Sequence, residues 1–440
     1  MHLFHDTYHR PRQALLLLLG LALGFLTAAV PTARATQSPT PERQLARSAQ
    51  PLDDLRPLGR MVGPADIVGL GEATHNSHEF FATKRRVFQY LVEEKGFTTF
   101  ALETAWSSGM RINAYVLRGE GDPERIAREE FQGSYAMWET REYLDLMRWM
   151  RGYNLRHTRK VQFMGDDMGY AGRELFDRVS AYTARHFPDL LPELTALYQE
   201  SRPTAGVGAT MDAMIKRPLA DRRRRADEVR RAYDLLSRRP GTDRGEGAWI
   251  LQYARTIAQT GALWSFDFSD PGQLRESRLF RDRVMAENTV WWQRRTGHRM
   301  LLSAHNGHVA YAPTLTGEYP KAQGAFIREL VGDAYMNIGF TFGRGSFNAL
   351  DLDDPAEPIR EFTVGPPAPG SNEEVLERVS PRDYYVDLRR VADPARTWLA
   401  AFRPTRSIGN SWPQDAERIR LGPSFDVLVH LHRVTAAHRL

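Results

Sequence analysis

The 440-residue chain contains no cysteine, and this absence excludes several kinds of chemistry at once. Disulfides, thiolate zinc sites, cysteine nucleophiles, iron–sulfur clusters and a lipobox lipid anchor all need the missing thiol. The chain also has little excess of charge of either sign, because its 59 basic and 54 acidic residues leave a net charge of only +5. So small an excess does not indicate a nucleic-acid partner.

Three widespread motifs are missing as well. The chain has no G-x-S-x-G elbow for a serine nucleophile, no G-x-x-x-x-G-K-[ST] phosphate loop and no H-E-x-x-H zinc helix. A hydrolase with this sequence would therefore need a histidine, or a metal ion, to activate water. The composition is that of an ordinary globular protein, with 42% apolar and 26% charged residues. It is sufficient for a large hydrophobic core and disfavours a disordered chain or a polytopic membrane protein.

The first 35 residues have the pattern of a secretory signal peptide. Arg10 and Arg12 precede an apolar stretch at residues 14–30, and residues 33–35 read ARA, a small-x-small cleavage site. An uncleaved membrane anchor is the alternative, because a spanning helix needs about 20 apolar residues. The cleavage pattern and the absence of disulfides favour an exported bacterial protein, periplasmic or extracellular, without stable membrane association after signal cleavage.

The rest of the sequence predicts one α/β domain. Residues 36–50 are polar and contain prolines, which indicates a short linker before a domain at 51–440. Amphipathic helical patterns occur near 80–94 and 139–156, and apolar strand-like runs alternate with them. These runs occupy residues 66–70, 98–102, 161–164, 299–303 and 335–340. The alternation is typical of a largely parallel central sheet flanked by helices.

Between residues 172 and 293 the pattern is almost entirely helical. We expect this segment to be a helical insertion that caps the active-site edge of the sheet. It contains the basic run at residues 222–225, which by itself suggests a phosphate or nucleic-acid patch. Acidic residues alternate with these arginines at helical spacing, so a solvated, ion-paired helix face is the better interpretation.

Ionisable residues follow four of the predicted strands. They are, in chain order, Glu72 with His75, Glu103, Asp166 with Asp167, and His305 with His308. Ligand sites of open α/β sheets form in the crevice outside the carboxyl ends of the strands. We therefore expect these carboxylates and imidazoles to line one pocket.

Lys84 falls inside the apolar stripe of the predicted helix at 80–94. A buried ammonium is costly unless it meets an anion, and Glu72 and Glu103 are the obvious partners. A side chain that reaches solvent at the edge of the helix is the alternative. An inward-pointing Lys84 would repel a divalent ion and, with a histidine, could stabilise an oxyanion.

Two H-N-x-H sequences keep a metal site open as a possibility. One contains His75 and His78, and the other contains His305 and His308. Imidazoles and carboxylates are common zinc ligands, although spacing on loops is a weak signal. Without a metal, Glu72 or Glu103 could instead hold one nitrogen of His75 and leave the other free to take a proton from water.

Together these motifs resemble those of the erythromycin esterase family. The resemblance begins in GLGEATHNSHEFFATKRRVFQYLVEEKGFTTFALET and continues through MWETREYLDLMRWMRGYN and VQFMGDD. It extends through RDRVMAENTVWW, LLSAHNGHVAY, GAFIRELVGDAYMNIGFTFGRGSF and SFDVLVHLHRVTAA. These stretches cover most of residues 60–435, and the Arg-rich helical section matches least.

The resemblance implies a carboxylic-ester hydrolase that opens the macrolactone of 14-membered macrolides without a covalent serine intermediate, and so an antibiotic-resistance function. The implied catalytic residues are His75 as the general base, together with Glu72, Glu103, His305, His308 and Lys84. Lys84 occupies a position that is arginine in some members, so the charge is kept but the bidentate fork is lost.

The expected partner is a small-molecule ester or lactone, and no cofactor or metal is expected. Because aromatic faces suit a large apolar lactone, we expect substrate contacts from residues near the strand ends. These residues are Trp106, Tyr115, Trp138, Tyr170 and Asp167. Two other functions stay open, namely a metal-dependent hydrolase or peptidase that uses the same His/Glu cluster and a non-enzymatic lactone-binding protein.

Overall fold

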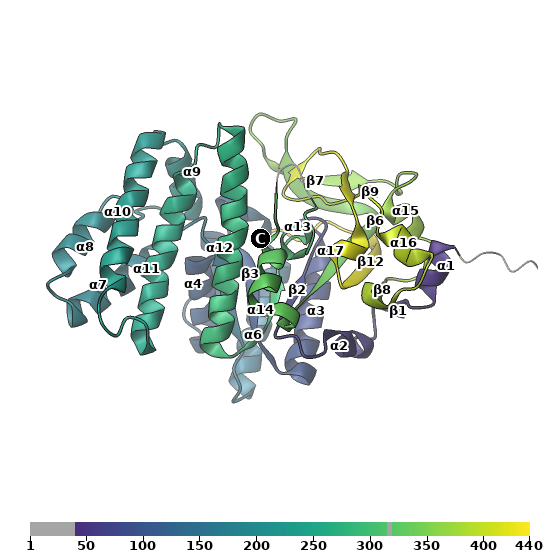
Figure 1. Cartoon of the computed structure of the whole chain (residues 1–440), viewed down its shortest axis with the longest axis horizontal. Coiled ribbons are helices and arrows are strands. Elements are labelled where there is room, and N and C mark those ends of the chain that lie inside the picture. The colour runs from purple at the N-terminus through teal and green to yellow at the C-terminus, as the bar shows by residue number, and fades with distance from the viewer. Residues whose placement is uncertain (1–39, 315–318) are drawn as a thin grey trace, which may run out of the picture. The chain divides into compact units, whose positions relative to one another are not determined.

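A ten-stranded mixed sheet forms the centre of the computed structural model, which describes residues 40–314 and 319–440. Its strand order is β1-β8-β12-β6-β2-β5-β3-β4, with β7 and β10 also paired to β6. Figure 1 labels β1, β2, β3, β6, β7, β8 and β12 of this sheet. The strands from β12 to β4 are parallel to their neighbours, whereas β1, β8 and β7 pair antiparallel. The predicted α/β fold with a mostly parallel sheet is confirmed.

The strands are β1 (Gln50–Pro51), β2 (Ile67–Leu70), β3 (Phe97–Ala105), β4 (Gln162–Asp167), β5 (Arg299–Ser303), β6 (Tyr335–Asp351), β7 (Ile359–Val364), β8 (Tyr384–Asp387), β9 (Arg403–Thr405), β10 (Ser411–Trp412), β11 (Glu417–Ile419) and β12 (Val427–Val434). Five of them, β2 to β6, correspond to the runs predicted from the sequence. β12 was not among these runs because His430, His432 and Arg433 interrupt its apolar pattern.

The α-helices are α1 (Pro41–Ala46), α2 (Arg56–Val62), α3 (His78–Lys95), α4 (Trp106–Arg118), α5 (Pro123–Glu130), α6 (Arg141–Arg156), α7 (Arg173–His186), α8 (Leu191–Tyr198), α9 (Val207–Ile215), α10 (Leu219–Ser237), α11 (Gly245–Trp264), α12 (Pro271–Thr296), α13 (Asn306–Val309), α14 (Gln323–Val331), α15 (Asn372–Leu376), α16 (Ala395–Leu399) and α17 (Leu421–Ser424).

Helices bury both faces of the parallel part of the sheet. Val68 and Leu301 pack into a core with residues of α3 and α6, whereas Ile67 and Met300 pack on the opposite face with residues of α12 and α14. Successive side chains of a strand point to opposite faces, so a strand covered on both sides is apolar throughout. All four residues of β2 are buried accordingly.

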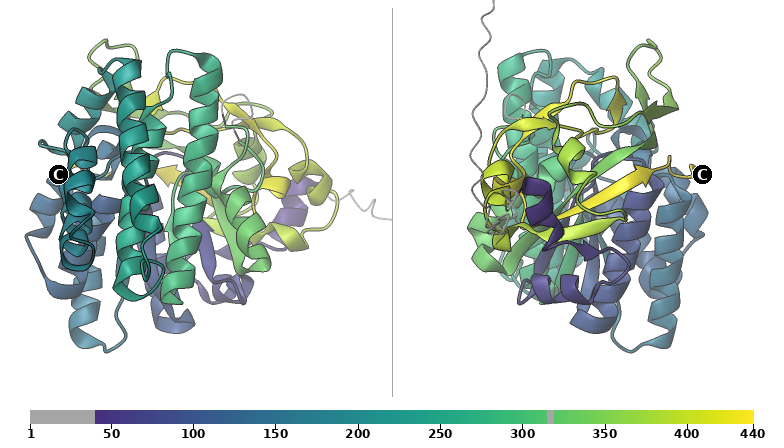
Figure 2. Two further views of the ribbon diagram at one scale, coloured as in Figure 1. Left: turned by 60° about the vertical axis from the view of Figure 1, so that its left-hand side comes forward. Right: turned by 90° about the vertical axis from the view of Figure 1, so that its right-hand side faces the viewer.

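The chain between β4 and β5 consists of helices α7 to α12 and no strand. Figure 2 shows the long helices of this segment, coloured teal to green, lying side by side. In α10, Arg224 pairs with Glu200, Asp221 and Glu228, as expected for an ion-paired face. Arg222 and Arg225 differ from the expected solvated face, because both are buried against backbone carbonyls.

Part of the segment predicted as a linker is built into the fold. Residues 41–46 form α1, Leu45 is completely buried, and β1 pairs with β8. One leucine among polar neighbours is a weak signal, and the strand partner lies more than 300 residues away in sequence. The predicted signal peptide at residues 1–35 lies outside the described residues. Within the described part of the chain, every helix is too short or too polar to cross a membrane.

Candidate active site

A cavity of about 800 Å³ opens at the carboxyl ends of β2, β3 and β5. Four of the residues predicted as catalytic line it: His75, Glu103, His305 and His308. The ring centroids of His75 and His305 are 4.9 Å apart. The volume lies within the range of about 300–1,000 Å³ typical of sites for small molecules. Residues from three strand ends therefore meet in one pocket.

His75 is held by a carboxylate behind it. Glu72 is completely buried and does not line the cavity, so its predicted place in the pocket wall is corrected. Its Oε1 accepts a hydrogen bond from His75 Nδ1 at 2.8 Å. The proton of the imidazole is thereby placed on Nδ1. Nε2, which has no hydrogen-bond partner among the described residues, keeps its lone pair at the cavity.

Lys84 lies on the far side of Glu72 from His75. Its Nζ donates to Glu72 Oε2 at 2.5 Å, to Ser303 Oγ at 3.0 Å and to the Ala304 carbonyl at 3.3 Å. Burial lowers the pKa of Lys84 from its ordinary value, and the Glu72 carboxylate opposes that shift. All three ammonium protons are used inside the protein. Lys84 therefore positions Glu72, and the expectation that it stabilises an oxyanion is corrected.

His305 faces the cavity with both ring nitrogens occupied. Nδ1 accepts from the Gly307 backbone N–H at 3.2 Å, and Nε2 donates to the Ile408 carbonyl at 3.0 Å. Burial, together with the nearby His75, holds the pKa of His305 well below its ordinary value. His305 is therefore neutral and fixed in this arrangement, and it is not available as the base.

His308 is the opposite case. Its Nδ1 lies 2.6 Å from Asp282 Oδ1 and its Nε2 lies 3.2 Å from Glu103 Oε1. Burial alone would lower the pKa of His308, but the two carboxylates outweigh it and raise the pKa well above the ordinary value. Burial would likewise raise the pKa of Glu103, yet His308 and Arg281 hold it well below its usual range. The imidazolium and the carboxylate are therefore both charged at neutral pH.

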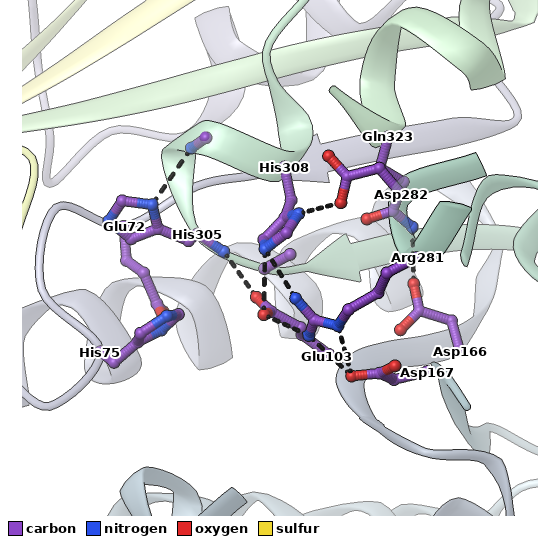
Figure 3. A network of polar contacts seen from close by, with 12 residues as sticks. Glu72, His75, Glu103, Asp166, Asp167, Arg281, Asp282, His305, His308 and Gln323 are labelled. Atoms are coloured by element: carbon purple, nitrogen blue, oxygen red, sulfur yellow. Dashed lines mark hydrogen bonds and ion pairs between the residues drawn. The ribbon is translucent and has the colours of Figure 1, made fainter. Parts of the chain in front are cut away.

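Arg281 joins this pair from helix α12 (Figure 3). Its Nη2 donates to Glu103 Oε1 at 2.9 Å and to Asp167 Oδ2 at 2.6 Å. Nη1 lies 3.3 Å from His308 Nε2. Since His308 is protonated, this last contact joins two donors and leaves the Nη1 protons without an acceptor among the described residues. Burial opposes the charge on Arg281, but Asp167 and Glu103 raise its pKa well above the ordinary value.

The middle residue of the second H-N-x-H sequence is structural. Asn306 Nδ2 donates to the Phe340 carbonyl at 2.7 Å, and its Oδ1 accepts from the Phe340 N–H at 3.0 Å. A Cβ on Gly71 would lie 2.1 Å from that Oδ1. Only glycine at position 71 therefore leaves room for the side-chain amide of Asn306 against the end of β2. Asn306 thus fixes the backbone on which His305 and His308 stand.

The predicted substrate contacts divide into two groups. Trp138 and Asp167 line the cavity, and the Trp138 ring meets His75 edge-on at 5.0 Å. Trp106, Tyr115 and Tyr170 do not line it. Trp106 packs against Trp291 and Trp292 on the opposite face, because the first turn of α4 directs it away from the pocket.

Several residues at the site were not predicted as site residues, although Arg281 and Asp282 begin the stretch RDRVMAENTVWW that resembles the family. Arg281 and Asp282 lie in the long helix α12, about 20 residues before β5, and nothing in their spacing shows that they reach back to the strand ends. Ile408 anchors His305, and the surrounding segment 407–417 lines the cavity far from the other motifs in sequence. Only tertiary contacts bring these segments to the pocket.

The cavity residues are not arranged as metal ligands. Among the described residues, two groups of three His, Asp or Glu side chains have ligand atoms within 4.8 Å of one another, and neither contains a cavity residue. The nitrogens of His305 and His308 are engaged by backbone groups and carboxylates, and the cationic Arg281 lies among them. This donor set does not fit a catalytic zinc, which needs three converging ligands and an open position.

Known proteins share this architecture. Over residues 92–434 the chain matches the model of the erythromycin esterase family. It is 24% identical to an erythromycin esterase type II of Escherichia coli over 78% of this chain and 85% of that protein. A solved Bacillus cereus protein superposes with a TM-score of 0.81 at 28% identity, over 91% of this chain and 98% of that one.

A mutant of the erythromycin esterase EreC, in its open conformation, superposes with a TM-score of 0.65 at 18% identity, over 88% of this chain and 95% of that one. At that identity the likeness concerns the fold. The family match covers far more than half of the chain and includes Glu103, Arg281 and both histidines of the second H-N-x-H sequence. The chain therefore belongs to the erythromycin esterase family and is a hydrolase of ester bonds.

Proposed function

We propose that this esterase cleaves a carboxylic ester or macrolactone with water that His75 activates, without a covalent serine intermediate. The observation that carries the proposal is the Lys84–Glu72–His75 chain of contacts, which leaves Nε2 of His75 open to the cavity. Among the described residues, no serine or threonine hydroxyl is hydrogen-bonded to a cavity histidine. Water is therefore the nucleophile that the arrangement favours.

The reaction begins when Nε2 of His75 takes a proton from water and the oxygen attacks the ester carbonyl. Glu72 then faces an imidazolium, whose charge it stabilises, as the acid does in a Ser-His-Asp triad. The tetrahedral intermediate breaks its bond to the alcohol oxygen, and His75 returns the proton to that leaving group. A carboxylic acid and an alcohol result, and from a lactone both remain on one opened chain.

Arg281 is the donor best placed for the oxyanion of the tetrahedral intermediate. Its guanidinium lines the cavity, and the Nη1 protons have no acceptor among the residues that the structure describes. Glu103 and Asp167 fix the other nitrogens, so the group is oriented before substrate arrives. Removing one preorganised oxyanion donor typically costs about 10²–10³-fold in kcat.

The helical segment 172–293 is proposed to be an insertion that caps this edge of the sheet. Leu263 and Trp264 of α11 and Arg278 of α12 line the cavity together with His75. A macrolide lactone is the proposed substrate, with a role in resistance. The likeness to a protein named erythromycin esterase type II supports it.

Incubation of the protein with macrolides, simple lactones and acyclic esters tests the proposal. We expect mass spectrometry to show addition of one water to at least one of them. His75→Asn should lower kcat by about 10²–10⁴-fold without loss of fold, because the nitrogens of the other described cavity histidines, His305 and His308, are engaged by other groups. Intact-protein mass after rapid quenching should show no acyl adduct. Binding without turnover would favour a lactone-binding protein, and activity that chelation removes and one metal restores would favour a metallohydrolase.

Export to the periplasm or medium remains a proposal that rests on the N-terminal pattern. Expression of the full chain in a Gram-negative host, followed by fractionation and N-terminal sequencing, tests it. We expect the exported protein to begin at Thr36. A protein that stays in the membrane fraction with residue 1 intact would indicate an anchor instead.

A further inference from the structure

A second group of ligand-type side chains lies outside the cavity, on the antiparallel side of the sheet. His430 and His432 stand two residues apart on β12 and so project from the same face of the strand. Glu377, directly after α15, reaches both of them. Its Oε1 lies 3.4 Å from His430 Nε2, and its Oε2 lies 2.9 Å from His432 Nδ1. One ligand atom from each of the three residues lies within 4.8 Å of the other two.

We propose that Glu377, His430 and His432 bind one divalent transition-metal ion, with Zn²⁺ as the best match. Two imidazoles and one carboxylate are a donor set that zinc uses in proteins, with water as the fourth ligand. Bonds of about 2.0–2.1 Å at tetrahedral angles place neighbouring ligand atoms about 3.4 Å apart. The separation between His430 Nε2 and Glu377 Oε1 has this value, whereas the 2.9 Å contact of His432 Nδ1 is with the other carboxylate oxygen, Oε2.

The surrounding residues hold two of the three ligands in place. His430 is completely buried, and its Nδ1 lies 2.9 Å from Thr341 Oγ1 on β6, which orients the ring and leaves Nε2 for the ion. The Glu377 carboxylate lies directly over Gly343, where a Cβ would be 1.5 Å from Oε1. Only glycine at position 343 leaves room for the Glu377 carboxylate beside β6.

The site is open to solvent on one side. The side chains of His432 and Glu377 are 23% and 29% exposed, so an ion and its water ligand can enter without rearrangement of the core. None of the three residues lines the catalytic cavity. A bound ion would join β12 to the turn after α15, which makes this a structural site whose occupancy does not depend on the proposed hydrolysis.

Metal binding to the purified full-length protein tests the proposal. After dialysis against Zn²⁺ we expect elemental analysis to find one ion per chain, and Co²⁺ to give the visible absorption of tetrahedral coordination. Saturation should raise Tm by a few degrees, because a ligand that binds only the folded state stabilises it. His432→Asn and Glu377→Gln should each weaken binding at least about 100-fold, since even losing an outer partner of a ligand costs 10–100-fold.

A second cluster provides the matched control. His78, Glu142 and His438 also have ligand atoms within 4.8 Å, with His438 mostly exposed at the surface. His438→Asn should leave zinc binding unchanged. Binding lost in His438→Asn and kept in His432→Asn would overturn the proposal, and so would no bound zinc at a tenfold excess over protein. Circular dichroism checks each fold, and Glu377→Gln decides the question if His432→Asn does not fold.

Discussion

The carboxylate of Glu72 is completely buried beside the candidate active site, and its two oxygens have different partners. Oε1 accepts from His75 and Oε2 accepts from Lys84. An isolated buried carboxylate would be very costly, whereas one that meets a cation and a fixed imidazole N–H is compensated. The charge that orients the proposed base therefore depends on a lysine that never meets the substrate.

Replacement of Lys84 should reveal this dependence. Lys84→Met keeps the length of the side chain but leaves Glu72 without its cation, so we expect the free energy of unfolding to fall by about 3–5 kcal/mol. The double variant Glu72→Gln/Lys84→Met removes both charges and should recover most of that loss. Urea denaturation of the two single variants and the double variant measures the coupling. Strictly additive effects would show that the two side chains do not form a coupled pair.

Glu373 provides a pH dependence at the scale of one residue. Burial raises its pKa from 4.5 to about 7, partly offset by the Arg406 backbone N–H at 2.9 Å. The folded state then holds a proton that the unfolded state has lost. The free energy of unfolding therefore decreases as pH rises from about 4.5 to about 7, by about 3 kcal/mol in total.

Glu373→Gln isolates this contribution, because the amide does not titrate. We expect the variant to gain about 2–3 kcal/mol relative to the unsubstituted protein between pH 5 and pH 8. Urea denaturation at both pH values gives the difference. A constant offset between the two proteins at the two pH values would mean that Glu373 is ionised in the folded state throughout.

Among the elements, α12 links the helical segment to the catalytic edge. It supplies Arg281 to Glu103 and Asp167, and Asp282 to His308. The helix has 26 residues and packs on α14 and β4, so these two side chains are held on a rigid support. A site built on helices and strands keeps its geometry better than one built on loops.

Arg281→Lys tests the role of this element in catalysis. Lysine keeps the positive charge but has no guanidinium. It therefore cannot bind Glu103 and Asp167 while a second nitrogen, the Nη1 of arginine, stays available to the substrate. We expect kcat to fall by about 10²-fold, with a smaller change in KM. Arg283→Lys on the same helix is the control, because Arg283 lies over the Phe280 ring and not at the cavity. Equal losses in both variants would point to a general effect on α12.

For the whole molecule, the helical segment and the sheet share one core. Val229, Ile257 and Val290 of that segment pack in the same apolar cluster as Ile67 and Met300 of the sheet. The described residues, 40–314 and 319–440, accordingly form one compact unit. Because the shared surface would be exposed if either part unfolded alone, the two parts are expected to unfold together.

Coincident unfolding is the measurable consequence. We expect far-UV circular dichroism, which follows the helices, and tryptophan fluorescence to give the same urea midpoint and slope. The matching control is Val229→Ala, which removes about 2 kcal/mol or less of burial and should shift both probes equally. Two separated transitions would instead show that residues 172–293 fold as an independent domain.

The sequence alone was enough to predict the features that a short run of neighbouring residues encodes, namely the buried strands and the polar residues at their ends. Runs such as residues 299–303 are apolar at every position, because strands buried on both faces admit nothing else. The polar residues that follow these runs meet at one edge of the sheet, because parallel strands all end at that edge. Glu72, His75, Glu103, His305 and His308 were predicted in this way, whereas the family was predicted from the resemblance of whole motifs and is confirmed by the family match.

Only the tertiary structure decided what each of these side chains does. Lys84, Arg281 and Ile408 lie far apart in the chain, and their contacts depend on how helices and a distant loop pack around the sheet. Trp106, the first residue of α4, packs in the core on the opposite face, whereas Trp138, which precedes α6, lines the cavity, and local sequence does not distinguish the two positions. Local periodicity places a residue on an element, but the partners that set its charge and role come from long-range contacts.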